Sequence, residues 1–396
     1  MISPVLPSYS RANLSFVKGE GSWMIEADGR RFLDFTSGIA VLALGHGHPK
    51  VVETLKAQAD KLWHTSNLYQ VPEQIALAER LVDHTFADTV FFCNSGTEAA
   101  ELAIKMARKY RDANGEPERT TILTFEGAFH GRSMAAISAA GTEKLVKGFG
   151  PLLPGFRHLP FGDHDALRAA AAEPDVGAIM VEPVQGESGI RPLPDVCLKG
   201  LRDLCDEHGL LLILDEIQCG MGRTGKLFAH EWAGITPDIM LVAKGIGGGF
   251  PLGALLATEE AAKGMTAGTH GSTYGGNPLG CAVGATVMDE ITSDGFLDAV
   301  NRKAGYLRQR LEGLVDAHPD IFETVRGSGL MLGLKCKVTN LDVVSAGYEQ
   351  GLLSVPAGDN VVRILPALTI TEEEIGEGIS RLDAAATALE NRAAAE

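Results

Sequence analysis

A lysine and an aspartate each follow a run of apolar residues that is typical of a buried strand. Lys244 comes after the run 238–243, and Asp215 comes after the run 210–214. Since the carboxyl ends of parallel strands lie along one edge of a sheet, we expect the amine and the carboxylate to lie close together. A lysine amine can form an imine with an aldehyde, and a carboxylate can keep a ring nitrogen protonated. A structural salt bridge is the alternative interpretation.

Glycines follow Lys244 almost at once, at positions 245, 247, 248 and 249. Residues without side chains let the backbone approach a ligand closely. A phosphate loop of a nucleotide-binding module is a rival interpretation. It is disfavoured because the glycines follow the lysine directly and form neither GxGxxG nor GxxxxGK[ST].

A candidate anion site follows another strand-like run, 89–93, which leads into Asn94-Ser95-Gly96-Thr97 and then into a pattern with helical spacing. The free N–H groups and the dipole at the N-terminus of a helix attract anions, a phosphate among them. The simpler alternative is that Ser95 or Thr97 only caps the helix.

The run 121–125 is followed by Phe129-His130-Gly131-Arg132. An aromatic ring at a strand end can lie against a planar ligand, and an arginine can bind a carboxylate through two hydrogen bonds. Without further context, a core phenylalanine and a surface arginine are the likelier interpretation, and the same holds for His130. His46 and His48 favour a turn over a metal site, because no third ligand follows at a recognisable spacing.

Together these groups match the needs of one cofactor, pyridoxal 5'-phosphate, which requires an amine, a carboxylate, an anion site and flat surfaces for its ring. We assign Lys244 to the aldehyde, Asp215 to the ring nitrogen, Ser95, Gly96 and Thr97 to the phosphate, Phe129 and Ile217 to the two ring faces, and Gln218 to the ring hydroxyl.

Six strand-like runs that alternate with helical patterns must position these residues. The alternation predicts an α/β fold with a mostly parallel sheet. Further signals predict a helix over 301–315, strands near 329–334 and 361–365, and a last helix from Thr371. We expect a large cofactor-binding domain over 56–290 and a smaller α+β domain from 1–55 and 291–396. The six runs are 89–93, 121–125, 178–181, 210–214, 238–243 and 252–257.

The amino-acid composition limits the classes of partner that the protein can bind. The chain has 35 Lys and Arg against 51 Asp and Glu, a formal net charge of −16, which disfavours nucleic acid and anionic membranes. No apolar run approaches 18 residues, and no signal-peptide pattern opens the sequence. The six cysteines form no CxxC pair, which is typical of a reducing compartment. We therefore expect a cytoplasmic protein with neither a membrane nor a nucleic-acid partner.

Over nearly its whole length the sequence resembles the class III, ornithine-type pyridoxal-phosphate aminotransferases, and among them the biosynthetic acetylornithine aminotransferases. The resemblance rests on many motifs that occur in the same order. These motifs are GIAV at 38–41, LGHGHP at 44–49, NSGTEA at 94–99, AFHGR at 128–132, VEPVQGE at 181–187, DEIQCGMGRTG at 215–225, AKGIGGGFP at 243–251 and HGSTYGGNP at 270–278.

The resemblance implies a fold type I transferase with a mostly parallel seven-stranded sheet, working as a homodimer whose active sites are shared between subunits. It implies that Thr273 of the partner subunit joins the phosphate site, with Ser272 of the partner subunit facing the substrate. It also implies that Arg132 and Arg363 receive substrate carboxylates. Glu187 would pair with Arg363 until a dicarboxylate displaces it.

The implied reaction moves the δ-amino group of N2-acetyl-L-ornithine to 2-oxoglutarate, giving N-acetyl-L-glutamate 5-semialdehyde and L-glutamate, a step of arginine biosynthesis. Ornithine δ-aminotransferases tend to carry an aromatic hydroxyl residue where this chain has Ile39, which favours an acylated ornithine. Succinylornithine, N-succinyl-diaminopimelate, ornithine and 4-aminobutyrate remain alternative amine donors. An aminomutase that uses the same cofactor is a further alternative.

Overall fold

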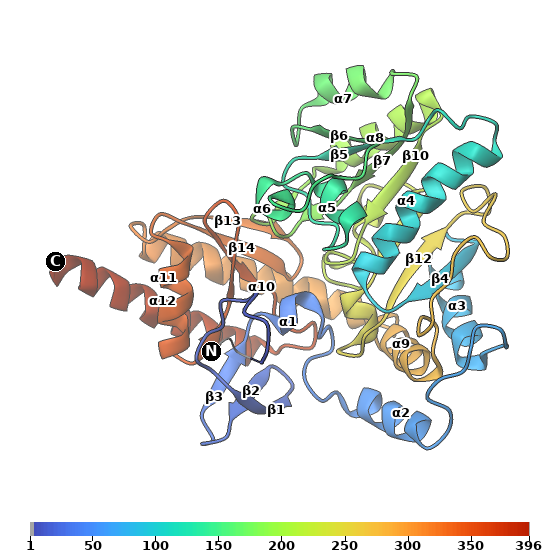
Figure 1. The fold of residues 1–396 in the computed structure, drawn as a ribbon. Helices are drawn as coiled ribbons and strands as arrows, with labels where there is room; N and C mark the ends of the chain where they lie inside the picture. The colour runs from blue at the N-terminus through green and yellow to red at the C-terminus, as the bar shows by residue number, and fades with distance from the viewer. Residues whose placement is uncertain (1–3, 396) are drawn as a thin grey trace.

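A seven-stranded sheet forms the centre of the larger of two lobes in the computed structural model, which describes residues 4–395 (Figure 1). All neighbouring strands are parallel except β12, which runs antiparallel to β4 and to β11. The predicted α/β fold with a mostly parallel sheet is thus confirmed. In spatial order the strands are β4 (Thr89–Cys93), β12 (Gly253–Ala257), β11 (Ile239–Val242), β10 (Leu211–Asp215), β7 (Val176–Val181), β5 (Thr121–Phe125) and β6 (Phe156–Leu159).

The six predicted strands all form, with ends shifted by at most two residues. The seven strands implied by the resemblance are present, but no apolar run located the seventh, β6. Its sequence is Phe-Arg-His-Leu, it lies at the edge of the sheet, and only Leu159 in it is buried. An edge strand with one buried residue has no apolar run that a sequence pattern can detect.

Apolar residues on both faces of the sheet explain why its strands read as continuous apolar runs. In β10, Leu211 and Ile213 pack with helices α4 and α5, whereas Leu212 and Leu214 pack with α7 and α8 on the opposite face. Helices α3 and α9 cover the end of the sheet near β4 and β12. The helices of this lobe are α2 (Pro49–Ala59), α3 (Pro72–His84), α4 (Gly96–Ala113), α5 (Met134–Ala140), α6 (Glu143–Val146), α7 (His164–Ala171), α8 (Asp195–His208) and α9 (Pro278–Ile291).

The smaller lobe contains the first and last described parts of the chain and is built on two four-stranded sheets (Figure 1). One sheet joins β1, β2 and β3 to β15, which pairs in parallel with β3. The other has the order β13-β14-β17-β16. The strands are β1 (Phe16–Glu20), β2 (Trp23–Glu26), β3 (Arg31–Asp34), β13 (Phe322–Ser328), β14 (Met331–Cys336), β15 (Leu352–Leu353), β16 (Val355–Ala357) and β17 (Val361–Ile364).

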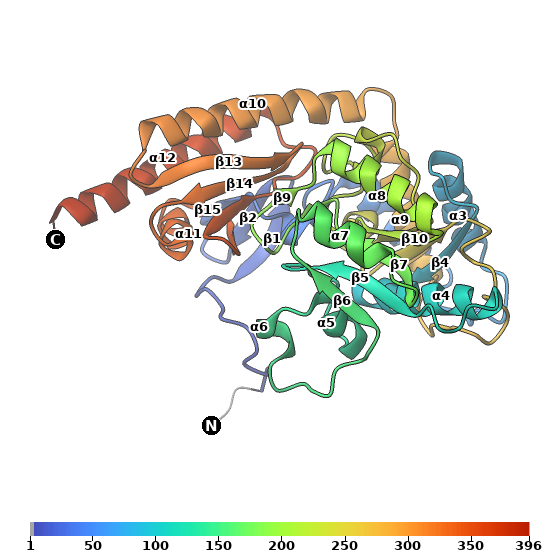
Figure 2. The same cartoon turned by 90° about the horizontal axis from the view of Figure 1, so that it is seen from above.

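Three helices complete the smaller lobe, and α10 and α12 run side by side along the β13–β14 sheet (Figure 2). The predicted elements of this region form: the helix over 301–315 lies inside α10, and the last helix starts one residue after Thr371. The division at residues 55/56 and 290/291 stays a prediction. The helices are α10 (Phe296–Ala317), α11 (Asn340–Glu349) and α12 (Glu372–Ala395).

Two short elements connect the lobes near the carboxyl ends of the large sheet: a single turn α1 (Ser37–Ala40) and a small hairpin of β8 (Val184–Gln185) with β9 (Arg191–Pro192). None of the helices between residues 4 and 395 is long and apolar enough to cross a membrane.

Candidate active site

A cavity of about 340 Å³ lies where the carboxyl ends of β4, β5, β10 and β11 meet. It contains every residue that the sequence assigned to the cofactor within one chain. Val41, His130 and Glu182 are among the further lining residues that were not assigned to it. The eight assigned residues are Ser95, Gly96, Thr97, Phe129, Asp215, Ile217, Gln218 and Lys244.

Lys244 follows β11 directly and opens a short 3₁₀ helix, Lys244–Gly247. Its φ of 48° places a residue with a side chain in the left-handed region, a strained conformation of the kind that clusters at functional sites. Its amine has no hydrogen-bond or ion-pair partner among residues 4–395. Burial lowers the pKa of Lys244, although the charge of Glu187 opposes this. Only the neutral amine acts as a nucleophile and a base, so a lowered pKa favours both roles.

Asp215 ends β10 and is held by His130, whose Nδ1 lies 2.7 Å from Oδ2 of Asp215. Both side chains are buried. Burial lowers the pKa of His130, but the hydrogen bond to Asp215 and the charges of Asp215 and Glu182 outweigh it, so the pKa is raised. The contact with this buried imidazole fixes the orientation of the Asp215 carboxylate. No signal in one sequence could have paired these two residues, which lie 85 positions apart.

Glu182 follows β7 and connects two strand ends. Its Oε1 accepts a hydrogen bond of 2.9 Å from the backbone N–H of Phe129, and its Oε2 accepts one of 3.4 Å from Gly186. Burial raises the pKa of this carboxyl to about 7, against the opposing charge of His130. Glu182 therefore fixes the backbone of Phe129, the residue assigned to one face of the cofactor ring. Sequence reasoning missed it.

Helix α4 starts where the sequence predicted it, and its role as an anion site stays a prediction. The Ser95 hydroxyl accepts a hydrogen bond of 3.3 Å from the N–H of Glu98, so this side chain does cap the helix. The N–H groups of the first turn have no partner within a helix and are available to a ligand. A Cβ added at Gly96 would lie 2.6 Å from Cδ1 of Ile217, so a side chain there would close the gap beside the candidate ring face.

Arg363 on β17 pairs with Glu187, with Nη1 and Oε1 at 2.5 Å. The guanidinium is buried, and 36% of the Glu187 side chain is exposed. Burial raises the pKa of Glu187, but the charge and hydrogen bond of Arg363 outweigh it, so the pKa is lowered. The two residues that the resemblance paired are thus in contact.

Like Glu187 and Arg363, three other predicted residues are not among those that line the cavity of their own chain. Arg132 is exposed, with its guanidinium 5.5 Å from the centre of the Phe129 ring. Thr273 is exposed on a loop beside Asn94, and Ser272 Oγ accepts a hydrogen bond of 2.9 Å from Gly275. Their roles toward carboxylates and phosphate stay predictions.

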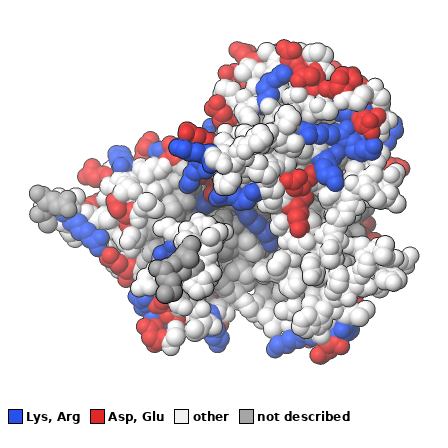
Figure 3. Space-filling model, viewed as in Figure 1, with Lys and Arg blue, Asp and Glu red and all other residues white. Residues whose placement is uncertain are grey.

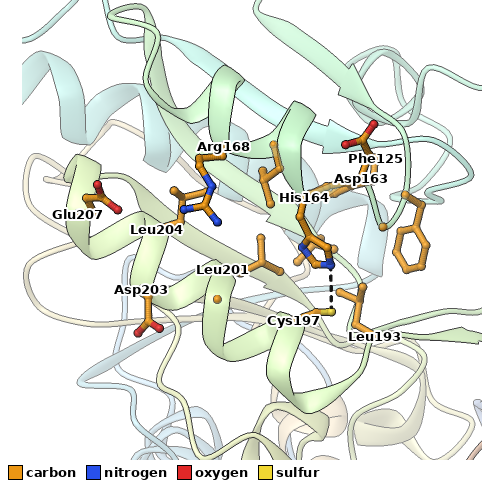
Figure 4. A pocket seen from close by; sticks show the side chains of 15 residues that line it. Phe125, Asp163, His164, Arg168, Leu193, Cys197, Leu201, Asp203, Leu204 and Glu207 are labelled. Atoms are coloured by element: carbon orange, nitrogen blue, oxygen red, sulfur yellow. Dashed lines mark hydrogen bonds between the residues drawn. The ribbon is translucent and has the colours of Figure 1, made fainter.

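A second cavity, of about 220 Å³, lies between α7 and α8 (Figure 4). Leu167, Leu201 and Leu204 form much of its wall, and Cys197 Sγ lies 3.5 Å from Nε2 of His164. No lysine lines this cavity and it does not contain the start of α4. The strand-end cavity is therefore the candidate active site.

The charge of the visible face suits an anionic ligand. Although the chain carries a net charge of −16, Lys and Arg side chains border part of the hollow between the two lobes (Figure 3). Such a local excess of positive charge raises the concentration of anions near a site.

The residues of the cavity fit pyridoxal phosphate. An unpaired amine, a fixed carboxylate and a helix N-terminus line one space, and Gly96 leaves room beside Ile217. The Oε1 atom of Gln218 is buried without a hydrogen-bond partner among the described residues, so it can accept one from a ligand.

Comparisons with known proteins agree with this geometry. The family model described as "Aminotransferase class-III" matches residues 7–386. An acetylornithine aminotransferase of Rhodobacter capsulatus is 68% identical over 394 residues, with all of both chains covered. A crystal structure of N-acetylornithine aminotransferase from Stenotrophomonas maltophilia is 40% identical and superposes with a TM-score of 0.86, over 96% of this chain and 98% of that one.

A more distant structure, the ornithine aminotransferase of Toxoplasma gondii, contains PLP at partial occupancy in its active site. It is 32% identical, with a TM-score of 0.94 over 98% of this chain and 93% of that one. The family match covers almost the whole sequence and the fold agrees over the same length. The chain therefore belongs to the class III aminotransferases.

Proposed function

We propose that the protein is a pyridoxal-phosphate enzyme that transfers the δ-amino group of N2-acetyl-L-ornithine to 2-oxoglutarate, giving N-acetyl-L-glutamate 5-semialdehyde and L-glutamate. The observation that carries the proposal is the meeting of Lys244, Asp215 and the start of α4 in one cavity. The 68% identity to a protein named acetylornithine aminotransferase supports the choice of amine donor, and with it a place in arginine biosynthesis.

Pyridoxal phosphate, when bound, supplies an aldehyde that takes up the amino group and a ring that accepts electrons from the reacting carbon. Lys244 would hold the aldehyde, and Asp215, held in place by its contact with His130, would hold the ring nitrogen protonated. The N–H groups of Gly96 and Thr97 would bind the phosphate. Phe129, Ile217 and Gln218 would fix the plane of the ring.

Lys244 also suits the proton transfer. Because burial lowers its pKa, the neutral fraction of the amine, which can accept a proton, is larger than in an exposed lysine. Its Nζ would take the proton from the δ-carbon of acetylornithine and later return a proton to the 2-carbon of the new glutamate. One group serves both halves of the reaction because both halves occur in the same cavity.

The Arg363–Glu187 pair explains how one site can accept two different substrates. The reacting carbon of acetylornithine carries no carboxylate, whereas 2-oxoglutarate has one beside its reacting carbonyl. Arg363 must therefore be neutralised in the first half-reaction and released in the second. Glu187 can neutralise it at 2.5 Å, and its partly exposed side chain is free to move away. An unpaired buried guanidinium would be costly, so a pair is required.

The proposal includes a homodimer in which Thr273 of the partner subunit completes the phosphate site and Ser272 of the partner subunit faces the substrate. Supporting it, Thr273 is exposed and lies outside the cofactor cavity of its own chain. We also propose a cytoplasmic location, since all six cysteines are free, as in proteins of a reducing compartment.

The test is a single-turnover reaction of the loaded enzyme with five amine donors: acetylornithine, succinylornithine, ornithine, N-succinyl-diaminopimelate and 4-aminobutyrate. We expect acetylornithine to react at least about tenfold more efficiently than ornithine, a difference of about 1.4 kcal/mol. A faster reaction with another donor would replace the proposed substrate. Repeated turnover without any keto acid, giving more than one product per active site, would indicate an aminomutase instead.

A further inference from the structure

The turn α1 has an unusual backbone. All four of its residues have positive φ: Ser37 at 46°, Gly38 at 62°, Ile39 at 63° and Ala40 at 62°. Three of them carry side chains, which the left-handed region disfavours, and L-residues visit this region singly and not as a helical turn. Such a segment persists only where its surroundings determine it strongly.

One buried carboxylate accepts three hydrogen bonds at the start of this turn. Asp34 is 2% exposed, and its Oδ1 accepts hydrogen bonds from Thr36 N at 2.7 Å, Thr36 Oγ1 at 2.6 Å and Ser37 N at 3.0 Å. Its Oδ2 lies 2.8 Å from Nε2 of His46, beyond the far end of the turn. Asp34 therefore joins the residues before and after α1.

On its outer side, the turn borders a cavity and is not held by packing against other residues that the structure describes. Thr36, Gly38 and Leu42 border a further cavity of about 460 Å³ beneath residues 11–16. Gly38 is exposed. His46, in contrast, is fixed by two backbone hydrogen bonds of 2.8 Å with Gly21. The carboxylate thus connects a strained turn to an anchored residue.

The inner side of the turn faces the active site. Val41, the first residue after α1, lines the cofactor cavity. Ile39 packs against an apolar cluster that includes Val361 and Leu365, which flank Arg363 in the sequence. A Cβ added at Gly249, in the glycine run after Lys244, would lie 3.0 Å from Cδ2 of Leu42.

We propose that Asp34 is a positioning residue that holds the left-handed turn 37–40, and through it Val41 and Ile39, in the geometry that receives the amine donor. The inference rests on the proposed function for the identity of that donor. Asp34 does not line the cofactor cavity, so it acts through the turn and not on the reacting atoms.

The test compares Asp34→Ala, Asp34→Asn and the double variant Asp34→Ala/Ala40→Gly in the loaded full-length enzyme. For Asp34→Ala we expect the KM for acetylornithine to rise about tenfold or more, with cofactor content unchanged and kcat altered less than about threefold. Glycine at position 40 tolerates positive φ, so the double variant should recover at least half of the lost affinity on a logarithmic scale. Asp34→Asn keeps one acceptor oxygen and should lie between the parent and Asp34→Ala.

Hydrogen exchange of the segment 36–42 gives a second readout that does not depend on the substrate. The N–H groups of Ile39, Ala40, Val41 and Leu42 are bonded within the turn, so their exchange should accelerate in Asp34→Ala and slow again in the double variant. Asp320→Ala, an exposed aspartate of the smaller lobe, serves as the matched control. Should Asp34→Ala not fold, Asp34→Asn is compared with the parent by the same two measurements.

Unchanged exchange in 36–42 together with an unchanged KM would overturn the positioning role. So would a loss of kcat and cofactor at constant KM. A parent enzyme that does not react with acetylornithine would instead contradict the proposed function. Exchange in 36–42 would then still decide whether Asp34 holds the turn.

Discussion

Arg363 of the smaller lobe and Glu187 of the larger lobe meet at 2.5 Å, and Glu187 also interacts with Lys244 and Gln218, which line the strand-end cavity. The contact joins a buried cation to a partly exposed carboxylate. Of the two side chains, only that of Glu187 is free to move away from the contact.

Replacing Glu187 by alanine should make glutamate a better donor relative to acetylornithine. The substitution leaves Arg363 unpaired and always available to a carboxylate, so the ratio of the two half-reaction rates should shift toward glutamate by roughly tenfold, or about 1.4 kcal/mol. Stopped-flow absorbance of the cofactor measures both rates. Glu187→Gln, which keeps the size of the side chain, should behave similarly. Unchanged rates for both donors would show that Glu187 does not control the access of substrate carboxylates to Arg363.

Replacing Lys244 by alanine should abolish the absorbance of the lysine-bound cofactor and slow turnover by roughly 10²–10⁴-fold or more, because the base is lost as well as the anchor. Lys335→Ala is a matched control. Lys335 also follows apolar residues, but it pairs with Asp359 at 2.5 Å, away from the cavity. A Lys244→Ala enzyme with normal turnover would contradict the whole assignment of the site.

A methyl group at position 96 should weaken cofactor binding without unfolding the protein. The new Cβ would lie 2.6 Å from Cδ1 of Ile217 and push that side chain toward the space for the ring. We expect the Kd for pyridoxal phosphate to rise about tenfold or more, with the Tm of the cofactor-free protein nearly unchanged. Gly305→Ala is the control, since a Cβ there meets nothing within 4 Å. Equal cofactor affinity in the two variants would argue against the predicted fit.

Shared active sites can be tested by mixing two defective variants. Lys244→Ala and Thr273→Val, unfolded together and refolded at a cofactor concentration that leaves Thr273→Val empty, form mixed dimers. If Thr273 serves the partner's site, each mixed dimer has one intact site, and the mixture should reach roughly a quarter of the parent activity. If Thr273 serves its own chain, no intact site forms and the mixture stays inactive.

His318 should make stability depend on pH through its contacts with α12. Its Nε2 lies 3.0 Å from Asp383 and its Nδ1 lies 3.0 Å from Glu390. Burial lowers the pKa of His318, but these two hydrogen bonds outweigh it and raise the pKa above 6.5. The stabilisation should be complete below pH 6.5 and be lost as the pH rises through the raised value.

The measurement is the Tm of the parent and of His318→Asn across this pH range. The difference between them should be largest below pH 6.5 and should shrink as the pH increases. A difference that grows with pH would mean that the imidazole is held neutral in the folded protein, against the two hydrogen bonds.

Much of the site was predictable because strand ends are visible in a sequence. The apolar runs before Asp215 and Lys244 are buried on both faces of the sheet, so their ends mark the edge where ligands bind. The glycines after Lys244 and the cap at Ser95 are local signals of the same kind. These features depend on neighbouring residues only.

What the sequence did not show depends on distant residues or on strain. His130 gains its role only from Asp215, and Glu182 only from the backbone of Phe129. The antiparallel direction of β12 leaves no trace in its apolar run. The left-handed turn carries Ile39 and Ala40, whose propensities argue against that conformation, so only the structure reveals it.

The parallel pairing of β15 with β3 has a consequence for biosynthesis. Asp34, at the end of β3, meets Leu353, which a ribosome adds about 320 residues later. At a synthesis rate of roughly 5–20 residues per second, strand β15 is added on the order of 15–60 s after β3, so the sheet of β1, β2 and β3 is incomplete until then. Every residue that lines the cofactor cavity has been synthesised by then, whereas Val361 and Leu365, in the cluster against which Ile39 packs, follow later. Each new chain would thus contain its whole cofactor cavity before the residues that support Ile39.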